Sequence, residues 1–196
     1  MHIFRNYLIK INIIIKEFIR ESVNVKIMTT EFAQLCSIRD QRPKLNPTKI
    51  ELDQQDAISG IEHYAENPAD IRVLETGTYV VIVAPQVGRS TGTTERYIDV
   101  WLRKNGEDIP NSNVRRVLGN SKDKDVLVCQ TMLPFKAGDI INIMMSVEVP
   151  NEGLGIEAIR PNGEPVIPSI IYSMHKIGEA GRFVSTGRGQ VKFSDR

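Results

Sequence analysis

Few side chains in this sequence combine the types and the spacing that catalysis or metal binding requires. The histidines are His2, His63 and His175, and none forms a close pair or stands in an acidic or cysteine cluster typical of a metal site. Cys36 and Cys129 lack C-x-x-C spacing and lie in apolar runs, which favours buried small side chains over reactive thiols. We therefore expect no catalytic residue, no metal site and no cofactor, and so no enzyme.

Motifs for nucleotide binding and hydrolysis are either absent or lack the sequence context that they require. There is no G-x-S-x-G elbow, and the Gly- and Thr-rich stretch 88–94 lacks the lysine of a phosphate-binding loop. Residues 153–158 match G-x-G-x-x-A, but a dinucleotide site needs a helix there, and the sequence R-P-N-G at 160–163 interrupts the chain. The acidic residues of 123–125 are too sparse for an EF-hand loop.

The charge balance argues against a nucleic-acid partner. The chain has 196 residues with 25 basic and 24 acidic side chains, and its formal net charge is +1. A protein that lives on phosphate backbones carries a much stronger positive excess. The balance is uneven, because residues 1–27 carry a net +3, residues 178–196 a net +2, and the remainder a net −4. The sequence thus predicts a mildly acidic domain between two basic segments.

Residues 1–30 form a basic leader with two open interpretations. Lys10 and Lys16 leave only a short apolar run between them, too short for a signal peptide, and no stretch approaches the roughly 20 apolar residues of a transmembrane helix. The leader is either an amphipathic surface helix or a disordered extension absent from the mature protein, with Met28 as the start. Residues 178–196, rich in Gly and Arg, are expected to be a flexible tail.

Between these segments, residues 31–177 read as a succession of short strands. Apolar and polar residues alternate in runs such as 78–83 and 97–103, and Asn105-Gly106 provides a tight hairpin turn. No run has helical spacing, and parallel strands would need long crossovers. The predicted fold is all-β, an antiparallel jelly-roll sandwich of about ten strands. The run 140–149 is apolar on both faces, so its second face must be covered, and a partner subunit is one candidate.

Several motifs of this domain resemble those of the tumour necrosis factor and complement globular-head (C1q-like) superfamily, in its bacterial or phage-type versions. They are Gly77-Thr78-Tyr79, the hairpin 102–106, the turn 135–141 and the closing strand 169–174. The resemblance implies a homotrimeric jelly roll, with the run 140–149 along the threefold axis. It also implies calcium near that axis as an option, for which the sequence identifies no ligands. The candidate trimer-interface residues are Ile141, Ile143, Met145, Val147, Tyr172 and Trp101.

The function predicted from these features is a non-enzymatic, trimeric structural or recognition module at a virion, spore or cell surface. An unknown protein or glycan receptor would contact the loops at one end, 88–95, 111–125 and 151–155. The candidate binding residues are Arg89, Thr91, Thr93, Arg115, Lys122, Asp123 and Asn151. A lectin or an enzyme on the same scaffold is the alternative. A lectin needs aromatic platforms on loops, whereas Trp101 lies in a predicted strand, in the core or an interface.

Overall fold

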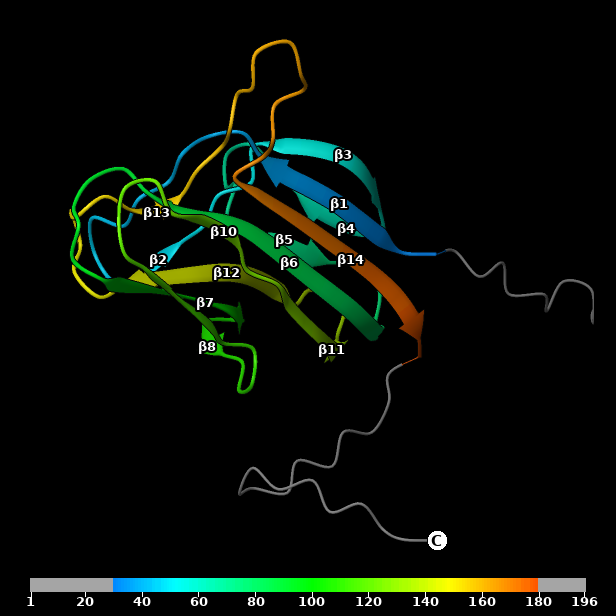
Figure 1. Cartoon of the computed structure of the whole chain (residues 1–196). Coiled ribbons are helices and arrows are strands. Elements are labelled where there is room, and N and C mark those ends of the chain that lie inside the picture. The colour runs from blue at the N-terminus through cyan, green and yellow to red at the C-terminus, as the bar shows by residue number, and fades with distance from the viewer. Residues whose placement is uncertain (1–29, 180–196) are drawn as a thin grey trace, which may run out of the picture.

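Two antiparallel β-sheets pack face to face in the computed structural model, which describes residues 30–179 (Figure 1). The predictions for the leader and the tail concern residues that, apart from 30, 178 and 179, lie outside this range. Within it no helix is formed, so none is available to cross a membrane. The predicted all-β antiparallel sandwich is confirmed.

The described part of the chain has fourteen strand segments, of which six have only two or three residues. The excess over the expected ten comes from these short segments. The strands are β1 (Phe32–Ser37), β2 (Thr48–Lys49), β3 (Gln54–Ser59), β4 (Ile61–His63), β5 (Ile71–Val73), β6 (Gly77–Arg89), β7 (Arg96–Lys104), β8 (Glu107–Asp108), β9 (Val114–Leu118), β10 (Lys124–Val126), β11 (Cys129–Phe135), β12 (Ile140–Val147), β13 (Leu154–Ile156) and β14 (Ile170–Gly178).

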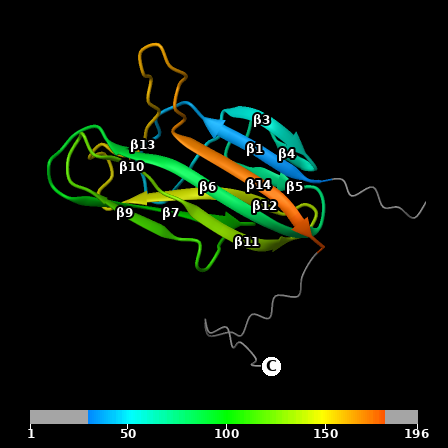
Figure 2. The same ribbon diagram turned by 45° about the vertical axis from the view of Figure 1, so that its right-hand side comes forward.

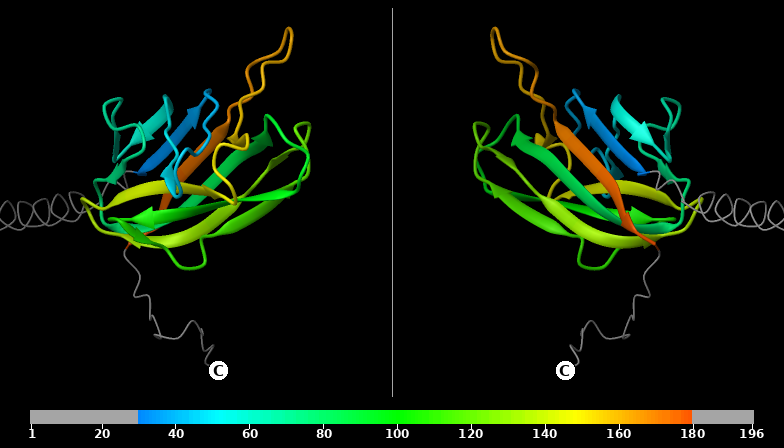
Figure 3. Two further views of the ribbon diagram at one scale, coloured as in Figure 1. Left: turned by 90° about the vertical axis from the view of Figure 1, so that its left-hand side faces the viewer. Right: turned by 90° about the vertical axis from the view of Figure 1, so that its right-hand side faces the viewer.

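The first sheet has the order β3-β1-β14-β6-β11, with β10 and β13 paired to the far end of the long β6. The second sheet has β12 at its centre, paired with β5, β2 and β7, and β7 in turn pairs with β8 and β9. Viewed from the side, the two sheets form the two layers of the sandwich (Figure 3). The first and last strands of the domain, β1 and β14, pair with each other in the first sheet.

The core lies between the sheets because every second residue of the long strands points inward. Tyr79, Val81 and Val83 of β6 have no exposed surface, and Tyr79 packs edge-on against Phe135 with ring centroids 5.8 Å apart. The Tyr79 hydroxyl donates to the carbonyl of Glu75 at 2.8 Å, which satisfies its polar end. Burial of each such large side chain stabilises the fold by about 1.5–3 kcal/mol.

The segment 153–158, which matches a dinucleotide motif, forms the strand β13 and its flanks. Gly155 pairs with Gly88 of β6, and no helix begins at this point. After β13 the chain leaves the sandwich in a long excursion closed by a bridge between Ile159 and Ile167, which protrudes from the body of the domain (Figure 2). The sequence predicted only that R-P-N-G at 160–163 interrupts the chain, and it did not predict the excursion.

Candidate interaction surface

Five of the six side chains predicted for a trimer interface lie inside a single chain. Ile141, Ile143, Met145, Val147 and Tyr172 belong to the core and are at most 2% exposed. They face the opposite sheet of their own chain, because they sit at alternate positions of β12 and β14. The prediction that these side chains form the subunit contact is therefore corrected.

The second face of β12 is also covered within the chain. Met144, on that face, is only 2% exposed and lies between its cross-strand neighbours Lys49 and Trp101. Asn142 donates to the carbonyl of Ala69 and to the Asp70 carboxylate, each at 2.7 Å. The apolar run thus needs no partner subunit to cover it.

Trp101, the sixth candidate, was expected in the core or an interface and lies on the outward face of the second sheet. Its neighbours Val100 and Leu102 fill the core, so alternation turns the indole outward, where it is partly exposed. The indole N–H donates to Asp108 Oδ1 at 2.7 Å. Trp101 is therefore not a core residue.

The outward face of the first sheet carries no Asp, Glu, Lys or Arg over the neighbouring strands β1, β14, β6 and β11. Cross-strand pairing aligns its side chains in rows, one of which runs Phe32, His175, Val80, Met132 and the next Gln34, Ser173, Ile82, Gln130. We call this surface the uncharged face. Its members are Phe32, Gln34, Cys36, Ile171, Ser173, His175, Val80, Ile82, Ala84, Gln130 and Met132.

Large apolar side chains of the uncharged face are exposed. Met132 is 56% and Ile171 is 39% exposed, and a shallow hollow of about 240 Å³ lies between Phe32, Val80 and Ile82. The polar groups there satisfy one another, since Ser173 donates to Gln34 Oε1 at 2.5 Å. An exposed apolar surface on a folded domain is typical of an interaction site.

The outward face of the second sheet is charged and ion-paired by contrast. Arg115 donates to both oxygens of Asp99 at 2.7 Å, and its guanidinium lies 3.8 Å from the centre of the Tyr97 ring. The pKa of Arg115 is raised by this hydrogen bond to Asp99. Arg103 donates to Asp108 at 2.7 Å. Arg115 and Arg103 of this face thus find their acidic partners within it.

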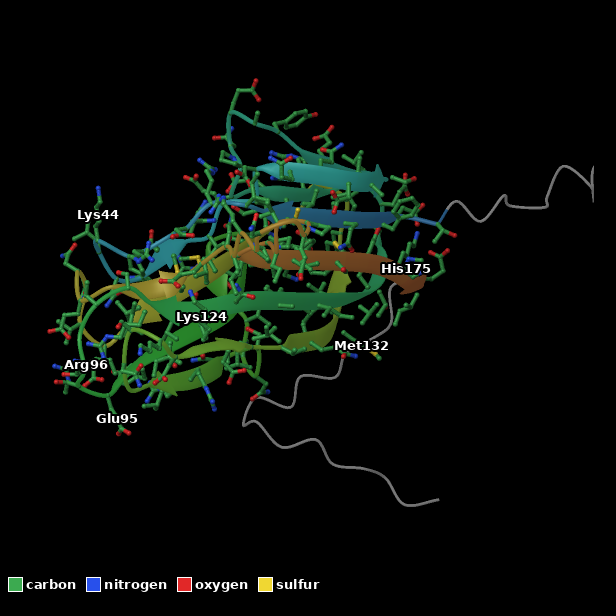
Figure 4. All side chains as sticks on the ribbon, turned by 45° about the horizontal axis from the view of Figure 1, so that its top comes forward. Lys44, Glu95, Arg96, Lys124, Met132 and His175 are labelled. Atoms are coloured by element: carbon green, nitrogen blue, oxygen red, sulfur yellow. The ribbon has the colours of Figure 1, made fainter. Side chains whose placement is uncertain are left out.

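The loops expected at one end do come together. An added Cβ on Gly153 would lie 2.6 Å from Thr91 Oγ1, and one on Gly119 would lie 3.9 Å from Glu95 Cγ. Thr91, Thr93, Lys122 and Asn151 are exposed there, with Asp123 partly buried. In Figure 4, Lys44, Glu95 and Arg96 lie at this end, and His175 and Met132 at the other.

Two of the predicted loop residues are not on loops. Arg89 is the last residue of β6 and is 2% exposed, with its guanidinium donating to the carbonyl of Thr94 and lying 3.7 Å from Glu152. Arg115 lies in β9, paired with Asp99. Both placements are corrected: Arg89 is buried, and Arg115, whose side chain is 56% exposed, lies on the face of a strand and not on a loop. The error arose because neither position has the apolar alternation that marks a strand.

A buried carboxylate, which no sequence motif predicted, connects the segments of this end. Glu157 is 5% exposed and accepts from Arg42 at 2.5 Å and from Lys124. Its three segments are separated by more than thirty positions, so only the fold brings them together. Nothing in local spacing could have identified the cluster.

The other candidates for catalysis or metal binding within residues 30–179 are the two cysteines, His63 and the acidic side chains. Both cysteines are unpaired and buried, and burial raises the pKa of each thiol. His63 lies in β4, with its Nε2 3.1 Å from the carbonyl oxygen of Pro68. No group of three or more His, Cys, Asp or Glu in the described range is arranged to hold a metal ion, and calcium ligands stay unidentified.

Comparison with known proteins finds likeness in fold alone. No protein-family model matches the chain, and no curated protein matches it. Crystal structures of murine APRIL, a tumour necrosis factor family protein, match at pH 5.0 with 16% identity and a TM-score of 0.48, and at pH 8.5 with 14% identity and a TM-score of 0.48. Each match covers 76% of this chain and 100% of the APRIL chain.

Proposed function

We propose that this chain is a non-enzymatic module that assembles with two further copies of itself through the uncharged face and serves in structure or recognition at a virion, spore or cell surface. The observation that carries the proposal is the contrast between the two sheets. Side chains on the outward face of one sheet are ion-paired, whereas the other sheet lacks charge over four strands and exposes Met132 and Ile171. The number of copies rests on the family resemblance.

Association would bury exposed apolar area without leaving an unpaired charge behind. Desolvating a charged side chain at an interface is costly unless it finds a partner, and the uncharged face presents none. In a cyclic trimer each subunit meets its two neighbours through different patches, so the uncharged face would surround the threefold axis. The end loops around Thr91, Lys122 and Asn151, at the rim of the sandwich, are the proposed recognition surface.

The test is the mass in solution, measured by sedimentation equilibrium. The wild-type chain should sediment as a trimer of 22.1 kDa subunits. Ile82→Glu places a charge at the centre of the uncharged face and should yield monomers that keep the native circular dichroism. Val117→Glu is the matched control, since Val117 is 50% exposed on β9 of the other sheet.

Each result bears on a different part of the proposal. A wild-type monomer at micromolar concentration would refute assembly altogether. A trimer that survives Ile82→Glu but dissociates with Val117→Glu would place the interface on the opposite sheet.

A further inference from the structure

The outward face of the second sheet contains a hollow of about 500 Å³ around Trp101. Its lining combines this indole with hydrogen-bonding side chains from β7, β8, β12 and the segment after β8. These are Asp99, Asp108, Asn111, Asn113 and Ser146. Volumes of this order fall in the range of small-molecule sites.

The indole is held in a fixed orientation. Its N–H donates to Asp108 Oδ1 at 2.7 Å, and the same oxygen accepts from Arg103 Nε at 2.7 Å. The hydrogen bonds from Arg103 and Trp101 lower the pKa of Asp108, so the carboxylate stays ionised to low pH. The core does not require this ring, because Val100 and Leu102 already fill it. A locked aromatic plane at the surface is thus available to a ligand.

The amide groups of the hollow stand on a segment that is clamped to the sheet. Ser112 is 2% exposed, its hydroxyl donates to the carbonyl of Ile109 at 2.8 Å, and it accepts from the amide of Leu102 at 3.0 Å. Its neighbours Asn111 and Asn113 are exposed on either side. Asn111 adopts a positive φ of 62°, a conformation that asparagine tolerates. The clamp therefore presents two carboxamides at defined positions.

We propose that this hollow binds a neutral saccharide. The apolar C–H face of a pyranose ring matches an indole plane, while its hydroxyls donate to carboxylates and accept from carboxamides. Each carboxylate of the site is paired with its own cation, Asp99 with Arg115 and Asp108 with Arg103, so the site has no net charge to attract an ion. A neutral, hydroxyl-rich ligand is the chemistry that this lining fits.

The hollow is formed within one chain, so the inference is independent of assembly. A shallow site of this kind binds weakly, and repeated copies in an assembly would raise the avidity.

The chain has a single tryptophan and five tyrosines, so fluorescence excited at the red edge of the indole absorption, where tyrosine does not absorb, reports on this hollow. Titration with methyl glycosides of the common hexoses at millimolar concentrations should give a saturable change for at least one sugar. Asn113→Ala should weaken that binding about tenfold or more. Tyr64→Ala removes a different aromatic, 55% exposed and outside the hollow, and should leave it unchanged.

Trp101 itself is tested on immobilised glycans with labelled protein. Trp101→Ala should abolish binding, and Trp101→Phe, which keeps a ring and protects the fold, should retain part of it. Retention of full binding by a folded Trp101→Ala protein would overturn the proposal. So would the absence of a saturable response to every sugar, or binding only of a cationic peptide.

Discussion

At the scale of single residues, Cys36 reports on whether the uncharged face is covered. It lies on that face beside Ile171, and burial together with the Asp56 and Asp53 carboxylates raises the pKa of its thiol. A higher thiol pKa leaves less thiolate at a given pH, and the thiolate is the reactive form.

We expect a disulfide reagent such as Ellman's reagent, at pH 8, to label native Cys36 at least about tenfold more slowly than the urea-unfolded chain. The Ile82→Glu variant, by opening the interface, should speed labelling of Cys36 but not of Cys129, which is 3% exposed in the core. A Cys36→Ser protein identifies the Cys129 signal. Equal acceleration of both thiols would mean that Ile82→Glu loosens the fold instead.

Glu157 is the residue whose loss should cost the most at the loop end. Glu157→Gln removes the charge that Arg42 and Lys124 bind, while keeping the side-chain shape. Because both cations can still reach water, we expect a loss of about 1–3 kcal/mol in the free energy of unfolding. Urea unfolding at fixed protein concentration measures it, as a lower midpoint with an unchanged slope.

Glu148→Gln is the control for that measurement. Glu148 is 36% exposed and lies 3.8 Å from Arg96, and an exposed pair of this kind contributes at most about 1 kcal/mol. Equal losses from the two variants would show that Glu157 has no special place in the network.

At the scale of elements, the hairpin between β7 and β8 shows how much turn chemistry contributes. Asn105 and Gly106 have φ of 51° and 86°, as the sequence predicted for a tight turn. Asn105 also accepts from the amide of Ile140 at 2.8 Å and donates to Asp139 at 2.7 Å, which ties the hairpin to the start of β12. The turn therefore fixes the register of two strand pairs.

Gly106→Ala should lower the free energy of unfolding by about 1 kcal/mol, because an L residue is strained at positive φ. An added methyl there meets nothing within 4 Å, so no steric clash contributes. Gly178→Ala is matched: its methyl also meets nothing within 4 Å, and its φ is not positive. That control should change stability by less than about 0.5 kcal/mol, as thermal unfolding can show. Losses of equal size would rule out backbone strain as the cause.

The strand β12 shows which properties could be predicted from the sequence and which could not. Its composition correctly indicated a strand apolar on both faces, since that property is local. What covers each face depends on partners far away in the sequence, such as Lys49 for Met144 and Ala69 for Asn142. Pairing of distant segments decides this, and no alternation pattern encodes it.

At the scale of the whole molecule, the outward faces of the two sheets differ, because one is uncharged and the other is ion-paired. The sequence showed strands in residues 31–177 but could not assign them to sheets, so the interface was predicted mainly on β12, whereas the uncharged face that we propose for assembly lies on β1, β14, β6 and β11. The uncharged rows appear only when the cross-strand register joins Phe32 to His175 and Val80 to Met132. The hollow at Trp101 was missed for the same reason, because Asn111 and Asp99 become neighbours only in the fold.

An apolar interface and a charged one respond differently to salt, so the salt dependence of the association constant tests which surface forms the contact. If the uncharged face forms the contact, raising sodium chloride from about 50 mM to 1 M should leave the association constant unchanged, because screening acts on charges that the face lacks. Sodium sulfate should strengthen association, and cooling should weaken it, as expected where apolar burial drives binding.

Assembly through the loop end would instead place the charged side chains Arg96, Glu148 and Glu152 in the contact between chains. Salt would then weaken the association. Sedimentation equilibrium across the salt series, with Val117→Glu as the charged control on the other sheet, separates the two. Dissociation of the wild-type assembly by sodium chloride alone would contradict the uncharged face as its interface, even if the mass at low salt is that of a trimer.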